Sequence, residues 1–264
     1  MFTNLNGHKF YFQESGTAVK DQTPILFIHG LGSSTLDWEH QISFFEKHYK
    51  ILSIDLRGHG KTLGSDEKYS ISLFANDVAA FLNEKKVKVH IVGISMGGLV
   101  AFQLAVDYPE LVQSMVIINS VVELPMDNPK VRKVIRLRKI VPRIMGMKMM
   151  GKVIGKKVFP YPHQGDLRVL IATRWATNKM KDYLKSVNAL AGWTVKDHIH
   201  KIEQPVLVLG GDNDYTTKAE KQEYTNLLPN ASLAIIPDTG HAVTMENPKA
   251  VNRIIFEFLT SNSL

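Results

Sequence analysis

One serine stands in a pattern that suits it for nucleophilic chemistry. Residues 93–97 read Gly-x-Ser-x-Gly with Ser95 at the centre, after an apolar run over residues 89–92 and before a helical pattern. This order predicts a strand, a sharp turn and a helix, with the serine hydroxyl held above the sheet by a strained backbone. Gly93 and Gly97 lack a Cβ, so the strand and the helix can approach closely around the turn. We therefore expect Ser95 to be a nucleophile.

A serine nucleophile needs a base within hydrogen-bond reach, and the base needs a partner that orients it. Two later apolar runs supply both residue types: Asp214 follows residues 206–209, and His241 follows residues 233–236. His241 would take the proton of Ser95, and Asp214 would fix the tautomer of the histidine. Taken singly, each stretch is also typical of a polar loop, so the prediction depends on the three residues occurring together and in this order.

The elements that must position these residues alternate along the chain. Largely apolar runs lie at residues 25–28, 51–54, 89–92 and 111–119, and helical patterns separate them. This alternation is typical of an α/β protein with a parallel sheet covered by helices on both faces. Ligands bind at the carboxyl ends of the strands in such a sheet, which is where Ser95 falls.

Five motifs together resemble those of α/β-hydrolase-fold serine hydrolases, the group of esterases, lipases and lactonases. They are His29-Gly30-Leu31-Gly32, Asp55-Leu56-Arg57-Gly58-His59-Gly60, Gly93-Ile94-Ser95-Met96-Gly97-Gly98, Gly211-Asp212-Asn213-Asp214 and Gly240-His241. The resemblance implies the α/β-hydrolase fold: a mostly parallel sheet, helices on both faces and an inserted helical cap. In that family the last position of Gly-x-x-Asp is the catalytic acid, which favours Asp214 over the alternative acid, Asp212. The serine differs from the aspartate of the haloalkane dehalogenase and epoxide hydrolase branches.

The resemblance also implies an oxyanion hole, two backbone N–H groups that stabilise the negative oxygen of a tetrahedral intermediate. One donor is expected to be the amide of Met96, directly after the nucleophile, and the other the amide of Leu31. His29, Gly30 and Gly32 would shape the loop around Leu31 and contact the substrate.

The alternation of predicted strands and helices stops at residue 121 and does not resume until after residue 193. We expect this segment, residues 121–193, to form a helical cap inserted between two parts of the core, residues 1–120 and 194–264. It contains sixteen Lys or Arg and four Asp or Glu, a local charge of +12, so the rest of the chain carries 7 − 12 = −5. Six of the ten methionines also lie in it, which suits an adaptable apolar wall.

One stretch of the predicted cap is an amphipathic helix, and Pro142 is expected to end it. Its two sides are an apolar stripe of Val131, Val134, Ile135, Ile140 and Val141, and a basic side of Lys130, Arg132, Lys133, Arg136 and Lys139. The basic side is open to three interpretations: a solvated face that merely covers the active site, a weak contact with an anionic membrane surface, or a site for an acidic ligand. Nucleic-acid binding would depend on this charge alone, and we do not expect it.

The composition excludes several classes of protein. The chain has 264 residues and no cysteine, so it has neither a disulfide framework nor a thiolate nucleophile. No apolar run is long enough to span a membrane, and residues 1–16 lack the apolar core of a signal peptide. We therefore expect a cytoplasmic protein. We also expect no cofactor and no metal, because His198 and His200 have no third ligand at a matching spacing.

These observations predict an enzyme, a carboxylesterase whose small-molecule substrate is an ester with a small to medium apolar acyl part. The alternative is a lactonase or a carbon–carbon bond hydrolase with the same three residues, which a polar or cationic pocket under the cap would favour. A non-catalytic small-molecule receptor on the same fold, with slow or single turnover, is the third interpretation. The sequence leaves the substrate and the oligomeric state open.

Overall fold

A single sheet organises the molecule. The computed structural model describes residues 1–17 and 22–262, and within them eight strands join in the order β1-β2-β4-β3-β5-β6-β7-β8. The strands are β1 (Phe2–Leu5), β2 (His8–Ser15), β3 (Ile25–Ile28), β4 (Ile51–Ile54), β5 (Val89–Ile94), β6 (Val112–Ile118), β7 (Val206–Gly211) and β8 (Ala231–Ile236). The pairs from β4 to β8 are parallel, and only β1 and β2 run antiparallel to their neighbours. The prediction of a mostly parallel sheet is confirmed.

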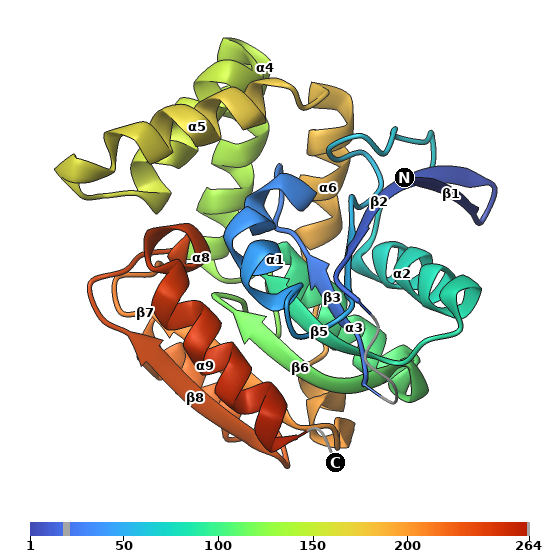
Figure 1. Cartoon of the computed structure of the whole chain (residues 1–264). Coiled ribbons are helices and arrows are strands. Elements are labelled where there is room, and N and C mark those ends of the chain that lie inside the picture. Colours follow the sequence, from blue (N-terminus) through green and yellow to red (C-terminus); the bar gives the residue numbers. More distant parts are fainter. Residues whose placement is uncertain (18–21, 263–264) are drawn as a thin grey trace.

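Helices cover both faces of the sheet (Figure 1). They are α1 (Glu39–Phe45), α2 (Ile71–Lys85), α3 (Met96–Asp107), α7 (Lys218–Thr225), α8 (Val243–Glu246) and α9 (Pro248–Ser261), with short 3₁₀ helices η1 (Thr35–Trp38), η2 (Pro109–Leu111) and η4 (Lys196–Lys201). Strand β3 contributes to two separate cores: Leu26 and Ile28 join the one that contains α2 and α3, whereas Ile25 and Phe27 join the one that contains α1 and α9. Successive side chains of a strand point to opposite faces, so a strand buried on both sides must be apolar throughout.

Capping residues fix the starts of two helices. The side chain of Ser70 accepts a hydrogen bond from the amide of Leu73 (3.0 Å) at the start of α2. Asn247 accepts one from the amide of Ala250 (3.2 Å) at the start of α9, and Pro248 occupies the first turn. The two capping side chains satisfy amides that have no acceptor inside the helix, and proline is well suited to the first turn because its missing amide is not needed there.

Between β6 and β7 the chain leaves the sheet and forms helices that we call the cap. They are α4 (Pro129–Val158), η3 (Pro162–Gln164), α5 (Gly165–Ala176) and α6 (Met180–Leu190). Figure 1 shows α4, α5 and α6 packed together beyond one end of the strands. Arg174 of α5 pairs with Asp37 (2.8 Å) after β3, and Lys181 of α6 pairs with Asp66 (2.8 Å) after β4. The cap is therefore tied to the loops at the carboxyl ends of these strands.

The expectation that Pro142 ends its helix was wrong. Helix α4 continues through Pro142 to Val158 and is interrupted only at Gly146, whose backbone has φ 76° and ψ 171°. Proline removes one amide donor, but the amides that follow it can still bond four residues back, so the helix resumes after Pro142. Glycine reaches a positive φ without strain, so the interruption falls there. Among the described residues, no helix has the length and apolar character needed to cross a membrane.

Candidate active site

Ser95 lies at the turn between β5 and α3, in a backbone conformation with φ 54° and ψ −116°. A non-glycine residue is strained there, and the surrounding structure must hold it. The two flanking glycines allow this. A Cβ on Gly97 would lie 2.1 Å from the carbonyl oxygen of Ile28, and one on Gly93 would lie 2.5 Å from the carbonyl oxygen of Gly97. The sharp turn predicted from the sequence is therefore present.

His241 and Asp214 form the hydrogen-bonded couple that the sequence predicted. Nδ1 of His241 donates to Oδ1 of Asp214 (2.7 Å), and the two residues follow β8 and β7. The alternative acid, Asp212, is turned elsewhere: its Oδ1 accepts the amide of Thr239 (3.2 Å) and the side-chain amide of Asn213 (3.0 Å). The geometry thus favours Asp214 as the partner of the base.

A buried lysine that the sequence did not suggest supports this carboxylate. Nζ of Lys221, on α7, lies 2.8 Å from Oδ2 of Asp214, and both side chains are fully buried. Thr216 also donates a short hydrogen bond to Oδ2. Burial opposes ionisation of Asp214, but His241 and Lys221 outweigh it, and the pKa of the carboxyl is held well below its ordinary value. Asp214 is therefore an anion that can orient His241 throughout the neutral range.

Tyr215, next to the acid, occupies the space between the base and the nucleophile. Its hydroxyl lies 2.6 Å from Nε2 of His241, and the two rings stack with centroids 4.0 Å apart. The same hydroxyl also contacts the side chains of Ser95 and Arg138. Because Nδ1 of His241 donates to Asp214, Nε2 is the acceptor and Tyr215 the donor. In this arrangement Nε2 of His241, which must accept the serine proton, already accepts a hydrogen bond from Tyr215.

The loop after β3 lies directly against the nucleophile. A Cβ on Gly30 would be 3.4 Å from Cβ of Ser95, so this part of the loop lies within van der Waals distance of the nucleophile. Met96 is the first residue of α3, and its N–H has no acceptor within the helix. Leu31 lines the cavities beside Ser95. Both predicted oxyanion-hole donors are thus close to Ser95, and their role remains a prediction.

The structure gives His29 and Gly32 a different position from the predicted substrate contacts, because neither lines a cavity at Ser95. His29 is fully buried; its Nε2 accepts the amide of Leu56 (3.0 Å), its Nδ1 donates to the carbonyl of Gly30 (2.8 Å), and burial lowers its pKa to about 4. Gly32 packs against the indole of Trp175. Both residues support the loop from behind, and of the three predicted substrate contacts Gly30 alone lines a cavity at Ser95.

Two cavities meet at Ser95. The larger has a volume of about 400 Å³ and the smaller about 80 Å³. The larger, which we call the chamber, has mostly apolar walls, with Leu99 and Val122 from the core side and Val131 and Ile135 from α4. Residues common to both cavities are Leu31, Ser95, Arg138 and Tyr215. Arg138 and Tyr215 thus form a partition beside the nucleophile.

Arg138 of α4 reaches the tyrosine hydroxyl beside the nucleophile, and it was not among the site residues predicted from the sequence. Its guanidinium donates to the hydroxyl of Tyr183 (3.2 Å) and contacts Tyr215; no carboxylate among the described residues pairs with it. The spacing of Arg138 from its apolar neighbours in the sequence could have indicated this position. Residue 138 follows Val134 by four positions and Ile135 by three, so it falls on the apolar side of the helix.

Other titratable groups fit no metal site. His198 and His200 lie in η4, outside the cavities at Ser95. Within residues 1–17 and 22–262, no three His, Asp or Glu side chains are grouped closely enough to hold a metal ion.

Known proteins resemble the chain over nearly its whole length. A sequence model described as the alpha/beta hydrolase family matches residues 25–254. A putative 2-succinyl-6-hydroxy-2,4-cyclohexadiene-1-carboxylate synthase of Bacillus subtilis is 27% identical over 260 residues, covering 92% of this chain and 94% of that protein. The 3-oxoadipate enol-lactonase 2 of Acinetobacter baylyi is 25% identical over 240 residues, covering 89% and 88%. The crystal structure of an enol-lactonase from Burkholderia xenovorans LB400 superposes with a TM-score of 0.91 at 21% identity, covering 98% of this chain and 100% of that one.

Proposed function

The chain belongs to the alpha/beta hydrolase family, and we propose that it is a hydrolase of carboxylic esters that uses Ser95, His241 and Asp214. The observation that carries the proposal is the strained serine that lines one cavity together with His241, the partner of Asp214, and also lines the apolar chamber. A serine hydroxyl gains nucleophilicity only from such a base, and an acyl group needs a water-poor space to bind. The family and the fold are those that the sequence motifs had indicated.

The first half of the reaction transfers the acyl group to the enzyme. Oγ of Ser95 attacks the ester carbonyl while Nε2 of His241 takes its proton. The carbonyl oxygen becomes negative and faces the amides of Leu31 and Met96. The bond to the alcohol oxygen then breaks, the proton passes from His241 to the alcohol, and the acyl group stays on Ser95. Tyr215 must leave Nε2 before this sequence begins.

The second half releases the acid. A water molecule attacks the acyl carbon as His241 takes one of its protons, and the oxygen of Ser95 leaves with that proton. Asp214 stays ionised in both halves and stabilises the imidazolium that forms twice. The mostly apolar lining of the chamber supports a small to medium acyl part, because burying such a group removes apolar area from water.

A chain-length series of p-nitrophenyl esters tests this function. We expect turnover with short to medium acyl chains, and labelling of Ser95 by a fluorophosphonate. Ser95→Ala, His241→Ala and Asp214→Asn should each lower kcat by several orders of magnitude, and their effects should not add, because the three act as one unit. Parent-like activity in Ser95→Ala would overturn the proposal. One slow turnover that leaves a stable adduct would instead favour a receptor.

Arg138 favours a second candidate: the same triad acting on an ester, lactone or ketone that also bears a carboxylate. A guanidinium in a cavity without an anionic partner binds a carboxylate well, because its paired donors match the two oxygens. The names of two relatives, a putative cyclohexadiene-carboxylate synthase and a 3-oxoadipate enol-lactonase, also point to acidic compounds. A cationic pocket is the feature expected of the lactonase or carbon–carbon hydrolase alternative.

Paired substrates separate the two candidates. The p-nitrophenyl half-ester of succinic acid and p-nitrophenyl butyrate present acyl parts of similar size with and without a carboxylate. If Arg138 holds the carboxylate, Arg138→Gln should raise KM for the half-ester by about 10-fold or more, which corresponds to a charged hydrogen bond, and leave the butyrate unchanged. Lys139→Gln, the neighbouring cation that lies outside the chamber, is the matched control. Equal effects of Arg138→Gln on both esters would exclude carboxylate recognition.

A further inference from the structure

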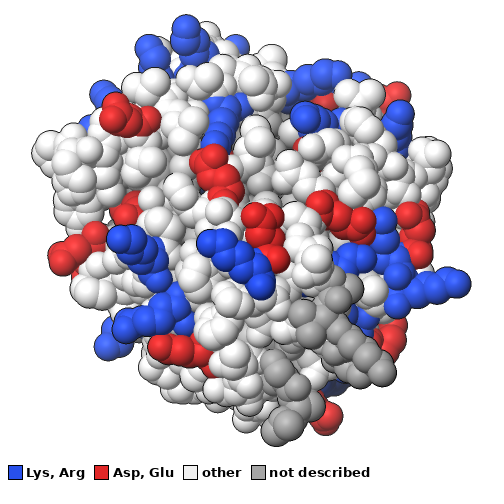
Figure 2. Space-filling model, in the orientation of Figure 1, with Lys and Arg blue, Asp and Glu red and all other residues white. Residues whose placement is uncertain are grey.

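The outer side of α4 carries charge that the protein itself does not neutralise. The thirty residues of this helix include eleven Lys or Arg and no Asp or Glu. Among the described residues, none of these cations takes part in an ion pair with a carboxylate. Two of them are satisfied by backbone carbonyls instead: Arg132 donates to Met126 and Asp127, and Arg143 donates to Lys139. Figure 2 shows several Lys and Arg side chains along the upper margin of the molecule, where the cap lies in that orientation, and others elsewhere on this face interspersed with Asp and Glu.

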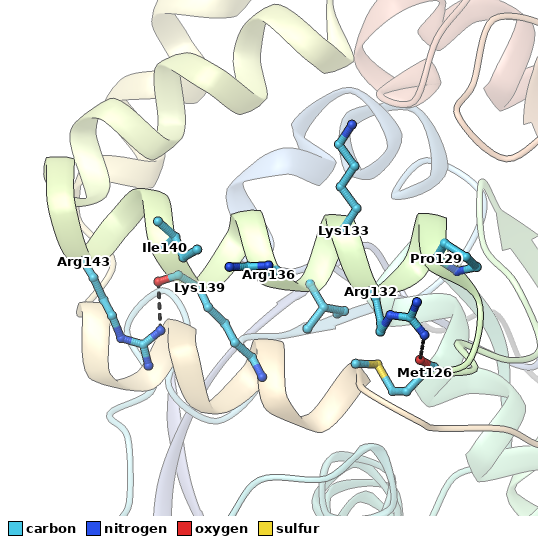
Figure 3. Close-up of a pocket in the computed structure, with 9 residues that line it drawn as sticks. Met126, Pro129, Arg132, Lys133, Arg136, Lys139, Ile140 and Arg143 are labelled. Carbon is cyan, nitrogen blue, oxygen red and sulfur yellow. Dashed lines mark hydrogen bonds between the residues drawn. The ribbon is translucent and has the colours of Figure 1, made fainter.

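The cations border an open groove. It has a volume of about 610 Å³, and five of the residues that line it are Arg132, Lys133, Arg136, Lys139 and Arg143. Figure 3 shows Lys139 and Arg143 extending from the same side of α4, whereas Lys133 extends from the opposite side. A concave surface with several cations and little competing negative charge concentrates anions. The groove is therefore suited to phosphate groups that arrive from outside.

Large apolar side chains stand exposed between these cations. Leu137 is 49% exposed, Ile144 is 77% exposed and Met145 is 55% exposed. The last two directly precede Gly146, where the helix is interrupted, and a Cβ at Gly146 would meet no atom within 4 Å. Ile144 and Met145 thus form a protruding apolar tip flanked by Arg143 and Lys148. Interleaved cations and aliphatic side chains on one helix face are typical of helices that lie in the interface of a membrane.

We propose that this face of α4, with its tip at Ile144 and Met145, docks on a bilayer that contains anionic phospholipids. The cations meet the headgroup phosphates, and the tip enters the boundary between headgroups and acyl chains. Another side of the same helix, with Val131 and Val134, lines the chamber at Ser95. Docking therefore brings α4, the cap helix that lines the chamber, to the lipid surface.

Charge and side-chain type argue against two other occupants. A second copy in a symmetric contact would place this cationic face against itself, and like charges at close range repel. Single-stranded nucleic acid is bound through cations together with exposed aromatic rings that stack on bases. The exposed large apolar residues of α4 are aliphatic or methionine: Val134, Leu137, Ile140, Ile144, Met145 and Val153.

Vesicle flotation of the full chain tests the proposal. We expect binding to vesicles of phosphatidylcholine with phosphatidylglycerol, much weaker binding to phosphatidylcholine alone, and loss of binding between about 0.1 M and about 1 M salt, because the Debye length falls from ~10 to ~3 Å. The variant R132Q/K133Q/R136Q/K139Q should bind at least about 100-fold more weakly, since each cation near such a surface contributes measurably. The matched control K47Q/K68Q/K218Q/K249Q removes the same charge from exposed lysines outside the cap and should bind like the parent.

The apolar tip has its own test. Ile144→Ser should weaken binding to the anionic vesicles several-fold at low salt, whereas Leu63→Ser, which changes an exposed leucine outside the cap, should not. Thermal unfolding checks that every variant is folded. Equal binding to neutral and anionic vesicles, or equal binding of the two quadruple variants, would overturn the proposal. So would sedimentation showing a dimer that Ile144→Ser dissociates in the absence of vesicle binding, which would assign the tip to a second copy.

Discussion

The hydroxyl of Tyr215 lies 2.6 Å from Nε2 of His241, the ring nitrogen that faces away from Asp214. Although the side chain as a whole is 42% exposed, desolvation around the hydroxyl raises the pKa of this phenol above its ordinary value, so it stays protonated and donates. Arg138, on the cap, contacts the same hydroxyl. Core and cap therefore meet at one hydrogen-bonded cluster, and any substrate that reaches Ser95 must rearrange it.

Tyr215→Phe should therefore raise catalytic efficiency toward small neutral esters. The change keeps the ring stacked on His241 but removes the hydroxyl that occupies Nε2, so the base is free more of the time. A net hydrogen bond contributes about 1 kcal/mol, which corresponds to an increase of about 5-fold. We expect this increase in kcat/KM for p-nitrophenyl acetate and in the rate of fluorophosphonate labelling.

The control is Tyr108→Phe, which removes a hydroxyl bonded to Asn76, away from the cavities at Ser95. It should leave both rates unchanged. A fall of tenfold or more in Tyr215→Phe would show that the hydroxyl takes part in the reaction as a donor, contrary to this interpretation.

Lys221→Met should destabilise the protein strongly at neutral pH. Lys221 is fully buried, and its ammonium lies 2.8 Å from the fully buried carboxylate of Asp214. Removing one partner of a buried pair leaves the other charge poorly compensated, at a cost of about 3–5 kcal/mol. Urea unfolding at pH 7 measures this loss. Lys218→Met, which changes an exposed lysine on the same helix, should alter the free energy of unfolding by less than about 0.5 kcal/mol.

The pair of Lys221 and Asp214 also predicts how the free energy of unfolding depends on pH in acid. The folded pKa of Asp214 is depressed, so its contribution is fully present above the ordinary aspartate pKa of about 3.9 and is lost as pH falls below it. Without Lys221 the folded pKa rises toward the unfolded value, and less stability remains to be lost. The slope of unfolding free energy against pH below about 4 should therefore be shallower in Lys221→Met than in the parent. Equal slopes would mean that Lys221 does not set this pKa.

The sequence predicted the parts of the site that local patterns encode. β3 spans residues 25–28 as expected, and the turn at Ser95 follows from two glycines and a change of periodicity. Asp214 and His241 were found because each follows an apolar strand, and the carboxyl ends of parallel strands meet at one edge. Predicting Ser95, Asp214 and His241 therefore required only local patterns and the order of strands and helices along the chain.

The missed residues depend on contacts between distant segments. Lys221 lies in a polar stretch that is typical of a solvated helix, and only the packing of α7 against β7 buries it beside Asp214. Arg138 was counted among the cations of the cap, although its spacing from Val134 and Ile135 assigned it to the apolar side. The sequence shows that a residue is charged but not which residues surround it, because an arginine or lysine in a pocket and one in water are written with the same letter.

Gly97→Ala should abolish activity and destabilise the fold. The added Cβ would lie 2.1 Å from the carbonyl oxygen of Ile28, which belongs to the strand backbone and cannot move aside. We expect a loss of more than about 3 kcal/mol in unfolding free energy, typical of severe overpacking. Gly165→Ala at the start of α5 is the control: its Cβ would meet nothing within 4 Å, and alanine favours the helix by roughly 0.5–1 kcal/mol. An active Gly97→Ala protein of parent stability would contradict the close approach of the turn to β3.

Three buried histidines predict a second loss of stability, at milder acidity. Burial lowers the pKa of His29 and of His90 to about 4, and burial with the nearby charge of His29 lowers that of His59 to about 3. In the unfolded chain all three would titrate near 6.5, so their contribution is present above that pH and is lost as pH falls from about 6.5 toward 4, by up to ~1.4 kcal/mol per histidine per pH unit. His59→Gln should reduce this slope by about a third, because one of the three groups no longer takes up a proton on unfolding. His40→Gln, at an exposed position, should keep the parent slope. Unfolding free energies measured at several pH values between 4 and 7 give the three slopes, and a His59→Gln slope equal to that of the parent would exclude His59 as a source of the acid sensitivity.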